Sequence, residues 1–337
     1  MNLSLVDLSP VLESETRHDA YNNSIEVAQH IEKLGFKRIW LAEHHNAKSF
    51  AGRTPEVLMA AIASKTSKIR VGSGSVLLNH YSAFKVAEVF SSLNELFPGR
   101  IDMGIGRATA GPLTDFALQQ DRSKQFKSDS AQQLLELLAW MENDFPQGHQ
   151  FSEVYMPTLD SLPKMYLLGS SVWSASAAAQ LGLSYVFAAF INQKGSKEML
   201  AHYRENFVPH EGQLRSKSPN AKIAIHIVCA ESRKEARRQL APVTLMYKHL
   251  QKGNLDFTLP APDKAVKILG ELPDAKTYEK GSGIPPKFLI GTPDEVKSQL
   301  DQIALDLAIE EVFIQDSFTD HKARLRSYEL LAQAYQL

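Results

Sequence analysis

The sequence contains little of what several classes of protein require. A single cysteine, Cys229, excludes an intramolecular disulfide framework and thiolate metal clusters, and is typical of a reducing compartment. Basic residues show no excess, since 37 Lys and Arg stand against 38 Asp and Glu. We therefore expect no nucleic-acid partner. With 337 residues, 44% of them hydrophobic, the chain is long enough to bury a large core.

Long hydrophobic runs are also missing. Residues 1–7 contain neither a basic region nor a long apolar run, so they do not resemble a signal peptide. Residues 165–193 carry no charge, but five serines and two glycines interrupt them. That composition favours a strand, a small-residue helix and another strand over a membrane span. We expect a cytoplasmic protein with no membrane segment.

Short apolar runs alternate with helical stripes along the whole chain. Eight strands and eight helical segments predict an α/β fold, a (β/α)8 TIM barrel with insertions in the loops at its C-terminal face, formed as a single domain over residues 1–337. A doubly wound open sheet is the alternative, and the lack of a visible linker favours the barrel. The predicted strands are 3–8, 37–42, 69–77, 101–105, 164–168, 183–189, 222–228 and 311–315.

The ends of these strands carry unusual residues, and in a barrel the C-terminal strand ends meet on one face. Glycines there allow backbone to approach a flat ligand, while serine hydroxyls, a helix N-terminus and an arginine are the parts of a phosphate site. For the serines, plain capping of the following helix is the alternative. The residues at these ends are Ser9, His44, His45, the run 72–75, Arg107, Ser170 and Ser171, with Ser174 one turn into the helix.

His44 and His45 are candidates for acid–base chemistry. Adjacent histidines on an extended segment point in opposite directions, and no second cluster with ligand spacing lies nearby in the sequence, so we expect no metal site. A histidine that titrates near neutrality in a partly closed barrel mouth is a plausible general base or acid.

Taken together, several stretches make the sequence similar to the bacterial luciferase-like flavin-dependent oxidoreductases over nearly its whole length. Singly, none of these stretches is specific. They are Trp40-Leu41-Ala42-Glu43-His44-His45-Asn46, Ile69-Arg70-Val71-Gly72-Ser73-Gly74, Pro98-Gly99-Arg100-Ile101-Asp102-Met103-Gly104-Ile105-Gly106-Arg107, Leu168-Gly169-Ser170-Ser171 and Gly291-Thr292-Pro293-Asp294-Glu295-Val296.

The resemblance implies the barrel fold and a flavin site at its C-terminal face. His44 and His45 would be the catalytic residues, and no metal would take part. A non-prolyl cis peptide is expected at Gly74-Ser75, and Gly106 stands where the luciferase has a larger residue beside the flavin, so light emission is not implied. The implied cofactor-binding residues are Ser73, Gly74, Ser75, Arg107, Ser170, Ser171 and Ser174.

The activity implied by the resemblance is that of a monooxygenase. It would use reduced FMN and O2 on a small-molecule substrate, with a separate flavin reductase as the source of reduced flavin, and it would form a homodimer. The alternatives are a deazaflavin-dependent hydride-transfer enzyme and a non-catalytic flavin-binding protein. Residues 260–286 would form either a lid or a surface loop. The substrate stays open among long-chain aldehydes, aromatic compounds and sulfur compounds.

Overall fold

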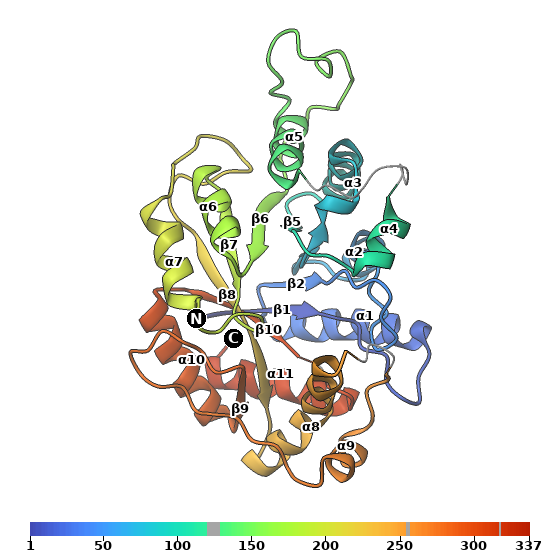
Figure 1. Ribbon diagram of the computed structural model, residues 1–337, viewed down its shortest axis with the longest axis vertical. Helices are drawn as coiled ribbons and strands as arrows, with labels where there is room; N and C mark the ends of the chain where they lie inside the picture. Colours follow the sequence, from blue (N-terminus) through green and yellow to red (C-terminus); the bar gives the residue numbers. More distant parts are fainter. Residues whose placement is uncertain (120–128, 254–256, 317) are drawn as a thin grey trace.

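The computed structural model describes residues 1–119, 129–253, 257–316 and 318–337. Its strands form one parallel sheet that closes on itself, with helices around the outside (Figure 1). The strands are β1 (Asn2–Asp7), β2 (Arg38–Leu41), β3 (Arg70–Ser73), β4 (Val76–Leu77), β5 (Ile101–Gly106), β6 (Lys164–Gly169), β7 (Ser184–Ala188), β8 (Ala221–Cys229), β9 (Phe288–Gly291) and β10 (Glu311–Gln315).

Helices follow almost every strand and cover the barrel. Within the described residues none is long and apolar enough to cross a membrane. They are α1 (Arg17–Lys33), α2 (Pro55–Lys65), α3 (Ala83–Leu96), α4 (Pro112–Leu118), α5 (Ser130–Glu142), α6 (Val172–Gln180), α7 (Ser196–Glu205), α8 (Arg233–Gln251), α9 (Pro262–Leu269), α10 (Pro293–Leu307) and α11 (His321–Tyr335), with a short 3-10 helix at Leu78–His80.

Eight strand positions close the ring, in the order β1, β2, β3 with β4, β5, β6, β7, β8 and β10. Closure is made where Val312 to Gln315 of β10 pair with Ile223 to His226 of β8, while the other edge of β10 pairs with β1. Every pairing is parallel, so all strand ends point to one face. The predicted (β/α)8 barrel is confirmed.

Two features of the sheet differ from the prediction. The expected strand over 69–77 is two strands, because β3 pairs with β2 and β5 whereas β4 pairs with β5 alone; the Gly74–Ser75 peptide between them is cis. β9 was not predicted; it pairs only with the last four residues of β8, outside the ring. β8 therefore belongs to the barrel in its first half and to a two-strand extension in its second.

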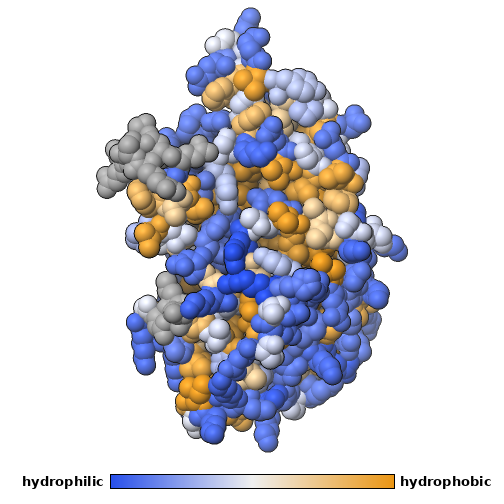
Figure 2. Space-filling view, turned by 90° about the vertical axis from the view of Figure 1, so that its right-hand side faces the viewer, coloured by the Kyte–Doolittle hydropathy of each residue, from blue (hydrophilic) through white to orange (hydrophobic). Residues whose placement is uncertain are grey.

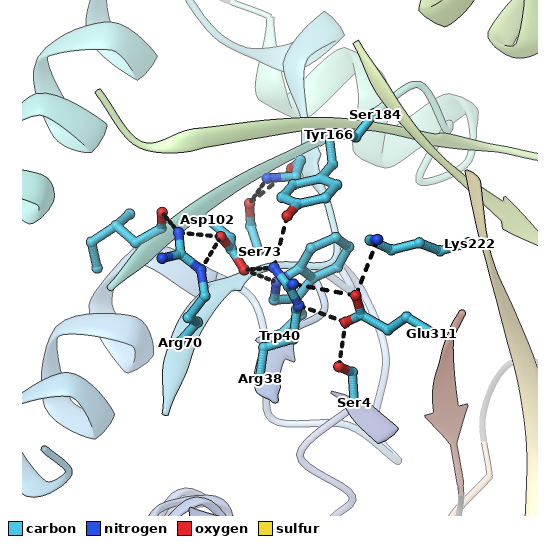
Figure 3. Close-up of polar contacts among 12 residues, drawn as sticks. Ser4, Arg38, Trp40, Arg70, Ser73, Asp102, Tyr166, Ser184, Lys222 and Glu311 are labelled. Atoms are coloured by element: carbon cyan, nitrogen blue, oxygen red, sulfur yellow. Dashed lines mark hydrogen bonds and ion pairs between the residues drawn. The ribbon is translucent and has the colours of Figure 1, made fainter. Parts of the chain in front are cut away.

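The floor of the barrel interior is an ion-pair network (Figure 3). Arg38 lies at its centre, with Nε 2.6 Å from Glu311 Oε1 and Nη1 2.7 Å from Asp102 Oδ2. Arg70 reaches the other oxygen of Asp102 at 2.6 Å, and Lys222 reaches Glu311 at 3.1 Å. Oppositely charged groups this close to each other compensate for the hydration that each loses on burial. The N-terminal end of the barrel is therefore filled by polar side chains.

Above this network the interior is apolar. Trp40 lies against Phe313, with ring centroids 4.1 Å apart, and donates its indole N–H to Asp102 at 3.0 Å, which joins the two layers. Because side chains alternate along a strand, the next inward positions lie at the C-terminal mouth. The apolar layer and the residues packed on it are Val6, Leu8, Trp40, Ala42, Tyr166, Val186, Ala224 and Phe313, with Phe50, Leu168 and Phe190 partly buried.

Candidate active site

The parallel ring brings most of the predicted site residues to the C-terminal face. His44 and His45 follow β2, Gly74 and Ser75 lie between β3 and β4, Arg107 follows β5, and Ser170 and Ser171 follow β6. Ser9, at the end of β1, is different. Its hydroxyl contacts Asp7 and Ser24 at 3.3 and 2.9 Å and is buried, so it supports the barrel wall.

His44 continues the inward-facing positions of β2, after Trp40 and Ala42. Its ring lies 5.1 Å from the ring of Phe50, and its backbone N–H donates to the carbonyl of Gly52 at 2.8 Å. Burial lowers its pKa to about 4, so the ring is neutral at physiological pH. Nδ1 is buried without a hydrogen-bond partner among the described residues. His44 thus brings an unpaired imidazole nitrogen to the site.

His45 points the other way, as expected for adjacent residues on a strand. Its Nε2 lies 2.6 Å from Oε1 of Glu43, whose side chain is fully buried. The hydroxyl of Tyr81 donates to the same oxygen at 2.6 Å, and the backbone N–H of Leu77 donates to Oε2 at 2.9 Å. Three donors around one carboxylate fix the ring of His45 in place.

Glu43 and Tyr81 were not predicted as site residues. Glu43 stands within the Glu43-His44-His45 run, and its position two residues before His45 puts both on the same face of the strand. That spacing is a signal that could have been used. Tyr81 gives no such signal, because it comes from the segment after β4 and meets Glu43 only through the fold.

The cis peptide expected at Gly74–Ser75 is present. A Cβ atom placed on Gly106 would overlap Oγ of Ser75, so the glycine leaves room for that hydroxyl. Ser73 is occupied within the sheet, since its hydroxyl donates to the carbonyl of Gly104 at 2.8 Å and accepts from the N–H of Gly104 at 3.0 Å. Its side chain therefore supports the wall of the site.

Arg107 and the start of α6 lie together. The Arg107 side chain is exposed, and its guanidinium carbon lies 4.5 Å from the ring centroid of Trp173 in the first turn of α6. Ser171 and Ser174 form a reciprocal capping box at this helix start, and the Ser174 hydroxyl donates to the carbonyl of Ser171 at 2.8 Å. The capping alternative thus describes these two serines in this structure.

The chemistry of this corner nevertheless fits a phosphate. The first backbone N–H groups of a helix have no partner within the helix and favour an anion, and a guanidinium adds charged donors. Ser170, half-buried just before α6, adds a hydroxyl. Among the described residues, no group of three or more His, Cys, Asp or Glu side chains is arranged to hold a metal ion.

The segment 260–286 is held against helices on the outside of the barrel. The Arg237 side chain donates to the carbonyls of Leu272 and Pro273 at 2.6 and 3.0 Å, and the Tyr278 hydroxyl donates to Asp306 at 2.6 Å. The segment also contains a helix, α9, which was not predicted. These contacts favour the surface-loop alternative over the lid.

Comparison with known proteins agrees with this geometry. The profile of the family described as luciferase-like monooxygenase matches residues 1–309. YwcH of Bacillus subtilis is 36% identical, with 99% of each chain covered. The N-acetyl-S-alkylcysteine monooxygenase of the same organism is 34% identical, covering 99% of this chain and 98% of that protein.

Solved structures agree on the fold. The crystal structure of apo-MsnO8 has a TM-score of 0.89 and 39% identity, and covers 100% of this chain and 98% of that one. Two more distant structures share the fold alone. The oxygenating constituent of 3,6-diketocamphane monooxygenase from a plasmid of Pseudomonas putida, in complex with FMN, has a TM-score of 0.71 with 18% identity, over 99% of this chain and 97% of that one. The structure of an F420-dependent secondary alcohol dehydrogenase has a TM-score of 0.65 and 14% identity, and covers 99% of this chain and 98% of that one.

Proposed function

The chain belongs to the luciferase-like monooxygenase family, and we propose that it is a monooxygenase that uses reduced FMN and O2 to oxidise a small organic molecule. The observation that supports this best is the joint position of Arg107 and the start of α6 on the face that carries His44. A separate flavin reductase would supply the reduced cofactor.

In this proposal each part of the face has its own task. Arg107, Ser170 and the backbone N–H groups at the start of α6 hold the FMN phosphate, with Ser171 and Ser174 shaping that turn. Gly74, Ser75 and Gly106 form the wall against which the flavin ring lies. Reduced FMN, when bound, supplies the electrons that activate O2, and the protein supplies position and electrostatics.

The two histidines would handle protons. His44 is neutral and has a free Nδ1, so it can accept a proton from the substrate side of the site or return one. His45 is held by Glu43 with Nε2 as the donor, so Nδ1 is the nitrogen that can exchange a proton. We expect His44→Ala to retain FMN binding and to lose turnover; unchanged turnover would remove His44 from the mechanism.

Two rival functions use the same face. One is hydride transfer with a deazaflavin, which the shared fold of an F420-dependent dehydrogenase keeps open. The other is flavin binding without catalysis. The buried arrangement around Glu43 and His45 argues against the second, because a simple binding protein has no need of an oriented imidazole.

The test is an anaerobic titration with photoreduced FMN, followed by rapid mixing with oxygenated buffer. Tight binding and a transient absorption distinct from free reduced and oxidised FMN would support the monooxygenase. Binding followed only by the reoxidation seen for free flavin would favour the non-catalytic protein. A failure to bind FMN, with binding of reduced F420 in the same assay, would favour hydride transfer.

We also propose that a second copy of the chain covers the groove between α2 and α3. Figure 2, which views the side carrying these helices, shows apolar residues gathered there. Val57 and Leu96 line the groove with 70% and 67% of their surface exposed. Light scattering should give a dimer for the parent chain and a monomer for Val57→Asp with Leu96→Asp. A monomeric parent chain would contradict the proposal.

A further inference from the structure

The ring order identifies the wall that lies across the mouth from the proposed flavin side. Counting either way round the eight positions, β8 is the fourth strand from β3, and β10 is the fourth from β5. The end of β8 therefore faces the Gly74–Ser75 peptide, and the end of β10 faces Arg107. A substrate that approaches the flavin ring from the open side meets the ends of β8 and β10.

His226 and Gln315 are the last inward-facing pair on these two strands. Lys222 and Glu311 meet inside the barrel floor, and Ala224 and Phe313 form the apolar layer two residues later. Two residues further, the alternation reaches His226 and Gln315, which are register partners. Both are buried, with 3% and 6% of their surface exposed.

His226 is a neutral aromatic surface with no spare polar atom. Its Nε2 lies 3.0 Å from the hydroxyl of Tyr247, and the ring also makes a hydrogen bond with the backbone of Gln315. Burial lowers its pKa to about 3, which keeps the imidazole uncharged. The ring is stacked on Phe288 at 5.1 Å, and the ring of Phe190 lies 5.6 Å away. This wall favours a flat, aromatic ligand.

Gln315, unlike His226, brings an unpaired polar atom to this wall. Its Oε1 is buried and has no hydrogen-bond partner among the described residues. Thr319, four residues further along, also leaves its hydroxyl buried and unpartnered. Buried polar atoms are almost always hydrogen-bonded in folded proteins, so an unpaired amide oxygen at a ligand-binding mouth indicates that a ligand donor completes it.

One charged side chain, Lys287, acts on His226, and its Nζ lies over the ring of Tyr247, 3.2 Å from the centroid. The rest of the interior cluster at this level, including Leu8, Ala42 and Leu168, is apolar. The unpaired Oε1 of Gln315 is an acceptor, so a carboxylate presented to it would lose hydration without offering a donor.

We propose that Gln315 is the residue of this protein that recognises substrate, and that the substrate is a neutral aromatic molecule carrying a hydroxyl or N–H group. The inference rests on the proposed function, because it takes the Gly74–Ser75 side of the mouth as the position of the flavin. It selects aromatic compounds from the three substrate classes left open by the sequence, which also included long-chain aldehydes and sulfur compounds.

The test is equilibrium dialysis of the FMN-saturated protein with three matched probes, naphthalene, 2-naphthol and 2-naphthoate. Dialysis with FMN alone comes first, so a failure of flavin binding, which would overturn the proposed function, is seen separately. We expect 2-naphthol to bind about ten-fold more tightly than naphthalene, the effect of one hydrogen bond to a buried acceptor. We expect 2-naphthoate to bind more weakly than both.

Gln315→Leu should abolish the preference for 2-naphthol over naphthalene while leaving FMN binding unchanged. Gln315→Met, which keeps the length of the side chain, is the second variant if the first folds poorly. Gln333→Leu, on the exposed surface of α11, is the matched control and should keep the preference. A preference that survives both Gln315 variants, stronger binding of 2-naphthoate, or displacement of 2-naphthol by equimolar decanal would overturn the proposal.

Discussion

Oε1 of Glu43 accepts the hydrogen bond of His45 Nε2 at 2.6 Å, and the same oxygen accepts the hydroxyl of Tyr81 at 2.6 Å. A carboxylate only accepts hydrogen bonds, so the pairing places a proton on Nε2 of His45. Tyr81 also lines the groove between α2 and α3. The orientation of one site histidine is thus connected to the face where a second copy is proposed.

Replacement of the Glu43 carboxylate should impair turnover more than binding. In Glu43→Gln, the side-chain amide can point its N–H donor at Nε2 of His45. The hydrogen bond that keeps a proton on Nε2 would then be lost. We expect turnover to fall roughly 100-fold, within the range of general acid–base catalysis. The FMN dissociation constant should stay within a factor of three or so, because the carboxylate of Glu43 bonds to His45, Tyr81 and Leu77 rather than to the groups proposed to hold the phosphate.

Nitrogen-15 NMR of the His45 ring reads the tautomer directly and distinguishes lost orientation from lost folding. Glu211→Gln, which alters an exposed residue paired with Lys217, is the matched control. An unchanged tautomer together with unchanged turnover would show that Glu43 does not position His45.

The stability of the ligand-free protein should fall as the pH drops from 6.5 towards 4. His226 has a pKa of about 3 in the folded protein, against 6.5 for the free side chain. The unfolded state therefore binds more protons in this window, and the free energy of unfolding rises with pH. One histidine contributes a slope of up to about 1.4 kcal/mol per pH unit.

His226→Phe removes this titration but also the contact with the Tyr247 hydroxyl. The variant should be less stable than the parent at pH 7, and the difference should shrink as the pH falls. Urea unfolding at pH 7, 6 and 5 measures the free energy of unfolding of both proteins as a function of pH. Parallel curves over this range would contradict the assignment of a neutral, buried His226.

Loss of one carboxylate from the barrel floor should be costly. In Glu311→Gln, Arg38 and Lys222 lose their shared counter-ion inside the barrel, which leaves a buried positive charge uncompensated. We expect a loss of about 3–5 kcal/mol in the free energy of unfolding. Glu211→Gln breaks an exposed pair with Lys217 and should cost less than about 1 kcal/mol. Comparable losses for the two variants in urea unfolding would refute this account of the network.

A methyl group on Gly106 should weaken flavin binding through Ser75. The added Cβ would overlap Ser75 Oγ, so Gly106→Ala must displace that side chain from the wall of the site. Overpacking of this kind costs about 1–3 kcal/mol. Ser75→Ala in the same chain should recover part of the FMN affinity lost in Gly106→Ala. No recovery in the double variant would show that the loss has another origin.

Much of the fold was accessible from the sequence because the signals are local. Periodic apolar residues and capping boxes such as that of Thr292 with Glu295 define individual elements, and all eight predicted strands lie within the observed ring. β9 was missed because its four residues, Phe288–Gly291, carry no alternation, and it forms only where the end of β8 supplies a partner.

The site was predictable in its residue types and less so in its contacts. The opposite directions of His44 and His45 followed from strand alternation, but the contact of Tyr81 with Glu43 depends on where the chain returns after β4. The serines at the start of α6 look the same in sequence whether they cap a helix or bind an anion. In the structure, Ser171 and Ser174 are hydrogen-bonded to each other, and the proximity of Arg107 to Trp173 is the observation that supports the proposed anion site.

The divided pairing of β8 separates two kinds of sequence change. Residues 221–226 are tied into the closed ring, where a shift by one position would turn every inward side chain outward. Residues 230–287 connect the end of β8 to β9, and β9 is paired with the ring by way of β8. Insertions and deletions in that excursion alter neither strand number nor register, so this part of the chain can diverge in length without disturbing the closure of the barrel.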